Sequence, residues 1–199
     1  MPEPYRGVKF EAEKVGSFTP TAPERKNIEK LVSLKETYVK YGFLDRNGGN
    51  FSFRADQGFI IKRTGVWIDK ITGQDFVRVT DVRDGRVFYE GDNLPSSECR
   101  THFYIYQNVP TVNFVFHAHA LEIAEKVGIE ADPCCIPVLS YGTMELAEIV
   151  SQKAKTMPFV IAKNHGVFAF GATFEETKRV LIDSYEQYRK FEAKTAQDN

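Results

Sequence analysis

The chain has 199 residues, of which 42% are hydrophobic and 27% charged, and its net charge at pH 7 is −1. This length suits one domain with its own core, and the balanced charge gives no general attraction to nucleic acid or anionic membranes. No apolar run reaches the ~20 residues of a membrane span, and the N-terminus lacks the apolar segment of a secretory signal. We therefore expect a cytoplasmic protein with neither nucleic acid nor membrane as a partner.

The first half of the chain predicts an arm, a helix and then strands. Residues 1–20 mix proline, glycine and charge without periodicity, which indicates an extended arm ahead of a single domain over 21–199. A helix is predicted over 21–42, where Thr21 and Glu24 fit a capping box. The apolar period then shifts toward two, which predicts short strands at 50–55, 58–64, 75–82 and 86–91.

The second half alternates helices with strands. The predicted elements are a helix over 96–108, a strand over 111–119, helices over 120–128 and 143–157, two strands joined by a tight turn within 159–171, and a last helix from 173. Helices distributed between the strands of a sheet, without a clear linker, predict an α/β protein.

Two of the four histidines stand one residue apart, in "FHAH" at the end of a predicted strand. Residues i and i+2 of a strand face the same side, so His117 and His119 can present two imidazoles to one point. His165 lies in a predicted turn at another strand end. Three imidazoles with one carboxylate are typical of a catalytic divalent metal, most commonly zinc. Two histidines at this spacing, taken alone, more often do not bind a metal, so the alternative that His117 and His119 are not ligands stays open.

Three turns are suited to binding an anion. Ser96 and Ser97 open a predicted helix, whose first N–H groups and positive dipole favour a phosphate. The turns at 48–50 and 63–65 contain glycine, which lets backbone N–H groups approach an anion closely. Simple helix capping and ordinary hairpin turns are the alternatives for these features.

Glu98 lies in the first turn of the same predicted helix. It is either a surface acid stabilised by the helix dipole or a metal ligand and base that turns into the site. His102 follows one helical turn later, and we interpret it as a residue that supports the site rather than as a ligand.

Six segments together resemble the class II aldolase/adducin family in the family's order, over roughly residues 24–190: "GGNFS", "IIKRTG", "LPSSE", "VFHAH", "YGTMELAE" and "IAKNHGVFAFG". The resemblance implies a three-layer α/β/α fold with a central mixed, largely antiparallel sheet. It also implies a homotetramer with active sites at subunit interfaces.

The activity that the resemblance implies is that of a lyase. A metal-dependent aldolase of this kind cleaves a keto-sugar phosphate by a retro-aldol step, through a metal-stabilised enediolate. Epimerisation, dehydration or decarboxylation of a related sugar phosphate on the same metal site is the alternative. A non-enzymatic, adducin-like interaction module is a third possibility, disfavoured because the metal residues are all present.

The resemblance also assigns residues. By motif match, His117, His119, His165 and Glu98 correspond to the metal ligands, and Glu98 also to the catalytic glutamate. The residues that match the substrate-phosphate site are Gly49, Asn50, Thr64, Gly65, Ser96 and Ser97. The expected cofactor is a divalent ion, with Zn²⁺ favoured and Mn²⁺, Co²⁺, Ni²⁺ and Fe²⁺ also compatible.

Two departures from the family concern the reaction. The segment between His119 and "YGTMELAE" is shorter than in the family aldolases and lacks their proton-donating tyrosine. Tyr141 is the best substitute donor, with a merely packed aromatic as the alternative. "IIKRTG" replaces the usual "ITPTG", so Lys62 and Arg63 either strengthen anion binding or are exposed on a strand. The motifs determine neither the substrate nor its stereochemistry.

Overall fold

The computed structural model describes residues 4, 6–44, 48–128 and 132–195 of the chain. Strands are β1 (Ala12–Gly16), β2 (Asn50–Arg54), β3 (Phe59–Lys62), β4 (Phe76–Arg83), β5 (Arg86–Glu90), β6 (Phe114–Ala118), β7 (Cys135–Ile136), β8 (Phe159–Ala162) and β9 (Gly166–Gly171). Helices are α1 (Ala22–Tyr41), α2 (Cys99–Asn108), α3 (Leu121–Ala124), α4 (Met144–Lys153) and α5 (Phe174–Thr195), with a 3₁₀ turn η1 (Ile68–Lys70).

The strands form one 9-stranded sheet in the order β1-β5-β4-β3-β2-β6-β9-β8-β7. The outermost pairs, β1 with β5 and β7 with β8, are parallel. The remaining neighbours are antiparallel. This confirms the predicted mixed, largely antiparallel sheet.

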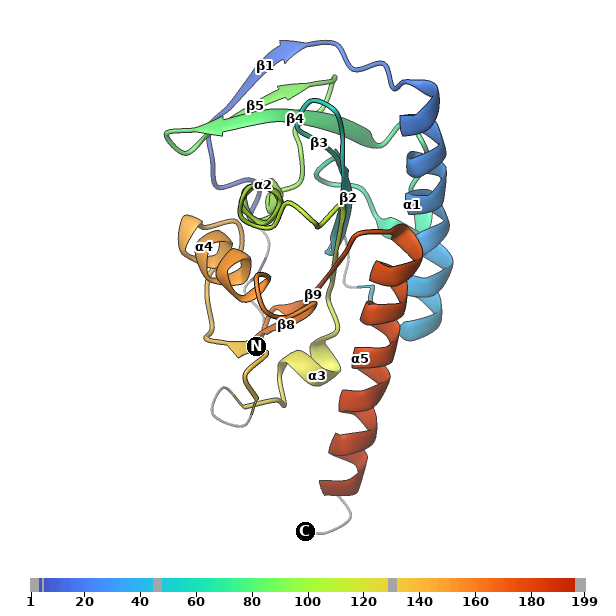
Figure 1. Ribbon diagram of the computed structural model, residues 1–199, viewed down its shortest axis with the longest axis vertical. Coiled ribbons are helices and arrows are strands. Elements are labelled where there is room, and N and C mark those ends of the chain that lie inside the picture. Colours follow the sequence, from blue (N-terminus) through green and yellow to red (C-terminus); the bar gives the residue numbers. More distant parts are fainter. Residues whose placement is uncertain (1–3, 5, 45–47, 129–131, 196–199) are drawn as a thin grey trace.

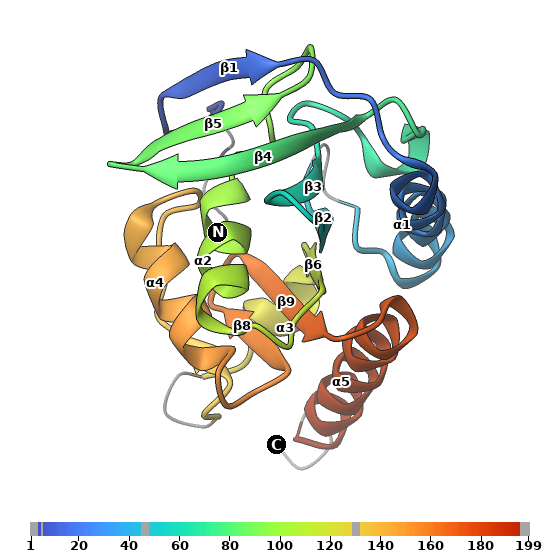
Figure 2. The ribbon, with the colours of Figure 1, turned by 45° about the horizontal axis from the view of Figure 1, so that its top comes forward.

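Helices cover both faces of the sheet (Figures 1 and 2). α2 and α4 lie on one face, over a core that includes Ile105, Val115 and Leu146. α1, α3 and α5 lie on the other, over a core that includes Leu31 and Phe51. The predicted α/β/α layering is therefore confirmed. Among the described helices, none has the length and apolarity needed to cross a membrane.

The start of α2 differs from the prediction. The helix begins at Cys99 rather than at residue 96, because residues 97 and 98 form a turn and the chain before them pairs with the end of β3. The N–H of Ser96 donates to the carbonyl of Lys62 at 3.1 Å, and Pro95 forms a β-bridge with Arg63. Pairing with the end of β3 thus delays the helix. The capping box of Thr21 and Glu24 is present as predicted.

The arm predicted over 1–20 contributes a strand that the sequence did not indicate. β1 lies at the sheet edge and pairs with β5. Its side chains are mostly exposed, so they show none of the alternation that marks a half-buried strand. Residues 129–131, in the shortened segment after His119, and the tail at 196–199 lie outside the described residues.

Candidate metal centre

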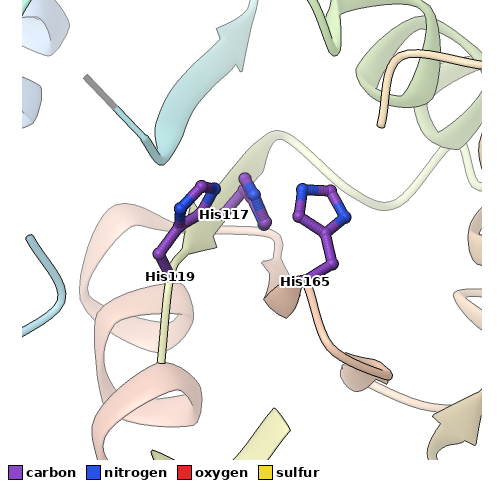
Figure 3. A group of neighbouring side chains, drawn as sticks. All are labelled: His117, His119 and His165. Carbon is purple, nitrogen blue, oxygen red and sulfur yellow. The ribbon is translucent and has the colours of Figure 1, made fainter. Parts of the chain in front are cut away.

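Three imidazoles meet at one end of the central strands (Figure 3). His117 is on β6, His119 follows its end, and His165 lies in the turn between β8 and β9. One ring nitrogen from each lies within 4.8 Å of the others. β6 pairs with β9, which explains why the turn before β9 reaches the end of β6. The spatial grouping predicted for these histidines is therefore present in the structure.

The orientation of His117 suits metal binding. Its Nδ1 donates to the carbonyl of Val167 on β9 at 2.9 Å, and its ring stacks on Phe168 with centroids 4.2 Å apart. Because a carbonyl only accepts, Nδ1 carries a proton, and Nε2 is the ring nitrogen that faces the site and can bind a metal. In proteins, metal-binding histidines are oriented by such a hydrogen bond from the ring nitrogen that does not bind the metal.

Glu98 supplies a carboxylate to the same place. Its Oε2 lies 3.0 Å from Nε2 of His117, and its Oε1 lies 3.2 Å from Nε2 of His165. Asn50 donates a third contact, from Nδ2 to Oε2 at 2.8 Å. Burial by itself raises the pKa of Glu98, but the neighbouring imidazoles outweigh it and hold the pKa below its usual range. Three imidazoles and an ionised carboxylate form a donor set that fits a divalent ion.

Two glycines allow the backbone to approach His117 closely. A Cβ at Gly49, where φ is +77°, would lie 3.0 Å from the carbonyl oxygen of His117. A Cβ at Gly166 would lie 2.4 Å from the carbonyl oxygen of Ala118 and 3.0 Å from Cε1 of His117. A side chain at either position would therefore push the neighbouring segments away from the histidine.

The predicted phosphate residues fall in three turns, at 49–50, 64–65 and 96–97. Two of these turns are joined by the backbone, because the N–H of Thr64 donates to Leu94 at 3.0 Å and that of Ser96 to Lys62 at 3.1 Å. The first turn is linked to the same helix start through the bond between Asn50 and Glu98. The structure thus brings the three turns around the start of α2, and phosphate binding there stays a prediction.

Lys62 and Arg63 are not simply exposed on a strand. Lys62 is 1% exposed, and burial lowers its pKa to about 8. Nε of Arg63 pairs with Oδ1 of Asp75 at 2.9 Å. A buried lysine is a feature that the sequence did not reveal, although Lys62 directly follows the apolar run "FII".

The hydroxyl of Tyr141, the predicted donor, is engaged by the N-terminal arm. It accepts from the N–H of Arg6 at 2.8 Å and donates to the carbonyl of Gly7 at 3.0 Å. The ammonium of Lys9 lies 3.7 Å from the centroid of the ring. The sequence carried no signal for this contact, because the arm and Tyr141 lie more than a hundred residues apart.

Arg100 extends this contact toward the predicted phosphate site. Its guanidinium donates to the carbonyl of Lys9 at 3.0 Å and also to that of Gly142. Gly142 in turn packs on Ser97, since a Cβ at this glycine would lie 2.6 Å from the carbonyl oxygen of Ser97. The arm, the turn before α4 and the turn before α2 are therefore in continuous contact.

Comparisons with known proteins identify the family of the chain and its fold. The sequence profile of the class II aldolase and adducin N-terminal domain matches residues 29–187. The L-fuculose phosphate aldolase of Escherichia coli O6:H1 is 30% identical over 154 residues, which cover 69% of each chain. A 5-methylthioribulose-1-phosphate/5-deoxyribulose-1-phosphate aldolase of Escherichia coli O45:K1 is 29% identical over 165 residues, or 75% of each chain.

A solved structure shares the fold. The L-fuculose-1-phosphate aldolase of Thermus thermophilus superposes with a TM-score of 0.70 and 18% identity, covering 86% of this chain and 95% of that one.

Replacing His117 tests the ligand assignment. Four-ligand zinc sites have binding free energies of about 10–16 kcal/mol. Losing one of the four ligands should therefore weaken zinc binding by ~3 kcal/mol, which raises the dissociation constant ~100-fold. We expect His117→Ala to bind zinc that much more weakly in a competition assay with a chelator. Val115→Ala, at a buried position on the same strand face, is the matched control and should keep its zinc. Equal affinity in wild type and His117→Ala would show that the ligand set is wrong.

The buried Lys62 predicts how stability depends on pH. In the unfolded chain a lysine has a pKa of ~10.4, whereas the folded value is about 8. Between these values the unfolded chain binds more protons, so stability rises with pH. Relative to Lys62→Met, wild type should gain ~1.4 kcal/mol of unfolding free energy from pH 7 to 9.

Urea titrations of the chelator-treated proteins measure this difference. Lys30→Met removes an exposed lysine and serves as the control, with no such change relative to wild type. A constant difference between wild type and Lys62→Met across this range would contradict the lowered pKa of Lys62.

Proposed function

The chain belongs to the class II aldolase and adducin family, and from that premise we propose that it is a metal-dependent aldolase that cleaves a keto-sugar phosphate. The observation that carries the proposal is the convergence of three imidazoles, two of which also contact the buried carboxylate of Glu98. Relatives named as aldolases of L-fuculose phosphate and of 5-deoxyribulose-1-phosphate support a ketose phosphate as the substrate class.

His117, His119, His165 and Glu98 would hold the divalent ion, and zinc is the ion that this donor set favours. When bound, the ion supplies Lewis acidity to the oxygens of the substrate. The hydrogen bond from His117 to Val167 keeps the ring in the tautomer whose Nε2 can ligate.

Retro-aldol cleavage moves two protons, and the chain offers a residue for each. One proton leaves the hydroxyl on the carbon that becomes the aldehyde, and one is added to the carbon of the ketone product. We assign the proton at carbon to Glu98, whose carboxylate is buried at the centre of the site. In cleavage this carboxylate would first take up a proton and then deliver it to that carbon, and in the aldol direction it would remove it. Asn50 holds that carboxylate in place at 2.8 Å.

Tyr141 is our candidate for the residue that transfers the proton of the substrate hydroxyl. Its hydroxyl is bonded to the arm at Arg6 and Gly7, so this role requires the arm to release it. The turn before α4 packs on Ser97, which places Tyr141 next to the predicted phosphate turns.

The three turns around the start of α2 would bind the substrate phosphate, away from the carbons that react. Such remote binding orients the substrate for bond cleavage. We also propose the homotetramer with interfacial sites that the family resemblance implies. Cys99, Cys134 and Cys135 are free thiols, which supports a reducing compartment such as the cytoplasm.

A product assay tests the function. Zinc-loaded protein is incubated with ketose phosphates that include L-fuculose 1-phosphate and 5-deoxyribulose 1-phosphate, and release of dihydroxyacetone phosphate is expected. Glu98→Gln should lower kcat by ~10²–10⁴-fold while it largely retains zinc, because the amide keeps an oxygen donor at this position. Conversion of a substrate without change of mass would identify an epimerase instead. Full activity in Glu98→Gln would remove this residue from proton transfer.

Substituting Tyr141 tests the second proton transfer. Tyr141→Phe removes only the hydroxyl, so kcat should fall by ~10²-fold with unchanged zinc content. Tyr41→Phe, which removes a hydroxyl bonded to Glu186 at 3.0 Å, is the matched control. If Tyr141→Phe keeps the wild-type kcat and only the arm becomes more sensitive to limited proteolysis, the hydroxyl serves the arm and not the reaction.

A further inference from the structure

β2 has two chemically different faces. Phe51 and Phe53 point into the core shared with α1 and α5. The alternate residues, Asn50, Ser52 and Arg54, are polar and bond to the chain segment that forms α2 and its N-cap. Two of these polar residues are buried, Asn50 at 3% exposed and Ser52 at 0%. Buried polar groups of this kind are retained when they are hydrogen-bonded.

Three sets of contacts, here called rungs, join the strand to the helix in succession: those of Asn50, of Ser52 and of Arg54. Asn50 donates to Oε2 of Glu98 at 2.8 Å. The hydroxyl of Ser52 is hydrogen-bonded to Nδ1 of His102 and to the hydroxyl of Tyr106, each at 2.7 Å. Arg54 then donates from Nη2 to the carbonyl of Tyr106 at 2.8 Å.

Arg54 also fixes the far end of the helix. It donates to Val109 at 3.3 Å and to Val112 at 3.0 Å, and its guanidinium lies 4.9 Å from the ring centroid of Tyr106. The bond to Tyr106 reaches a carbonyl in the last turn of α2, where carbonyls lack partners within the helix, and the bonds to Val109 and Val112 hold the segment that follows it. The helix is therefore attached to β2 at both ends and in the middle.

The spacing explains why three rungs fit. Residues two apart on a strand are separated by ~6.7 Å, and residues four apart on a helix by ~6 Å. Positions 50, 52 and 54 can therefore match positions 98, 102 and 106 in succession. A shift of one residue turns the helix by ~100° and would break every rung, so the contacts define one register for α2.

We propose that Ser52 and His102 are positioning residues, which hold Glu98 in register with the three imidazoles by fixing α2 to β2. The side chains of this central rung touch neither Glu98 nor the substrate turns, so its action on the site runs through the helix. The inference rests on the role of Glu98 in the proposed function.

The chemistry of His102 agrees with this role. The ring is 0% exposed, and burial lowers its pKa to about 3, so it is neutral at physiological pH. Its Nε2 is buried and has no hydrogen-bond partner among the described residues. A buried polar atom without a partner reduces stability, so a gain in stability does not by itself account for an imidazole here.

Crystal structures of the zinc-loaded variants test the proposal directly. Ser52→Ala removes both bonds of the central rung and His102→Leu removes its bond to the imidazole, and the carboxylate of Glu98 should then move out of hydrogen-bond distance of Nδ2 of Asn50. His102→Asn keeps a polar atom at the position of Nδ1 and should restore the wild-type position. If the carboxylate of Glu98 keeps its wild-type position in both Ser52→Ala and His102→Leu, the proposal is overturned. This outcome does not depend on whether any sugar phosphate is turned over.

Solution measurements separate positioning from general destabilisation. In both variants kcat should fall by ~10–100-fold with KM nearly unchanged, because the phosphate turns are intact, and His102→Asn should recover most of the loss. Ser151→Ala also removes a hydroxyl at 0% exposure, on α4 and away from β2, and should keep kcat. An equal loss in Ser151→Ala, or no rescue in His102→Asn, would show that the effect is only structural.

If His102→Leu does not fold, Ser52→Ala decides by the same criteria, since it removes one oxygen and keeps the imidazole. If no substrate is found, the proposed function fails while the crystallographic comparison still supports or overturns the positioning of Glu98.

Discussion

The carboxylate of Glu98 is 3% exposed and lies between the imidazoles of His117 and His165. A charge in such a position is tolerated only when it is paired and hydrogen-bonded, because removal from water is otherwise very unfavourable. The partners come from β2, from the end of β6 and from the turn before β9, while Glu98 itself precedes α2. Four distant parts of the chain must therefore meet to within hydrogen-bond distance.

The sheet and its glycines make that meeting possible. β6 lies between β2 and β9 in the sheet, so both neighbours reach the same end of β6. Gly166 then permits a contact that any Cβ would block, and Gly49 one that a Cβ would crowd. The position of α2 is the remaining variable, and the polar face of β2 defines it through Asn50, Ser52 and Arg54.

The N-terminal arm belongs to the same system of contacts. Its strand β1 extends the sheet at one edge, and the residues before it bind Tyr141. Arg100 in the first turn of α2 holds both the arm and Gly142. A segment that reads as an irregular tail is therefore linked, through Tyr141 and Arg100, to the turns predicted to bind phosphate.

Local patterns in the sequence determined most of the secondary structure and indicated which residues are candidates for the site. Alternation predicted β2 and β6, capping residues predicted the start of α1, and the spacing of His117 and His119 placed two imidazoles on one side, because these signals depend on neighbours in the chain. Order and spacing of the motifs also indicated the family and its fold.

Tertiary structure decided the contacts between distant segments. Pairing with the end of β3 makes α2 start later than predicted. Lys62 is buried, and the hydroxyl of Tyr141 is hydrogen-bonded to the N-terminal arm. The sequence likewise did not determine the partner of each polar residue on β2. Alternation of apolar and polar residues along a strand shows that one face is polar, but not which segment that face contacts. Such contacts depend on how helices and strands pack, which no local pattern encodes.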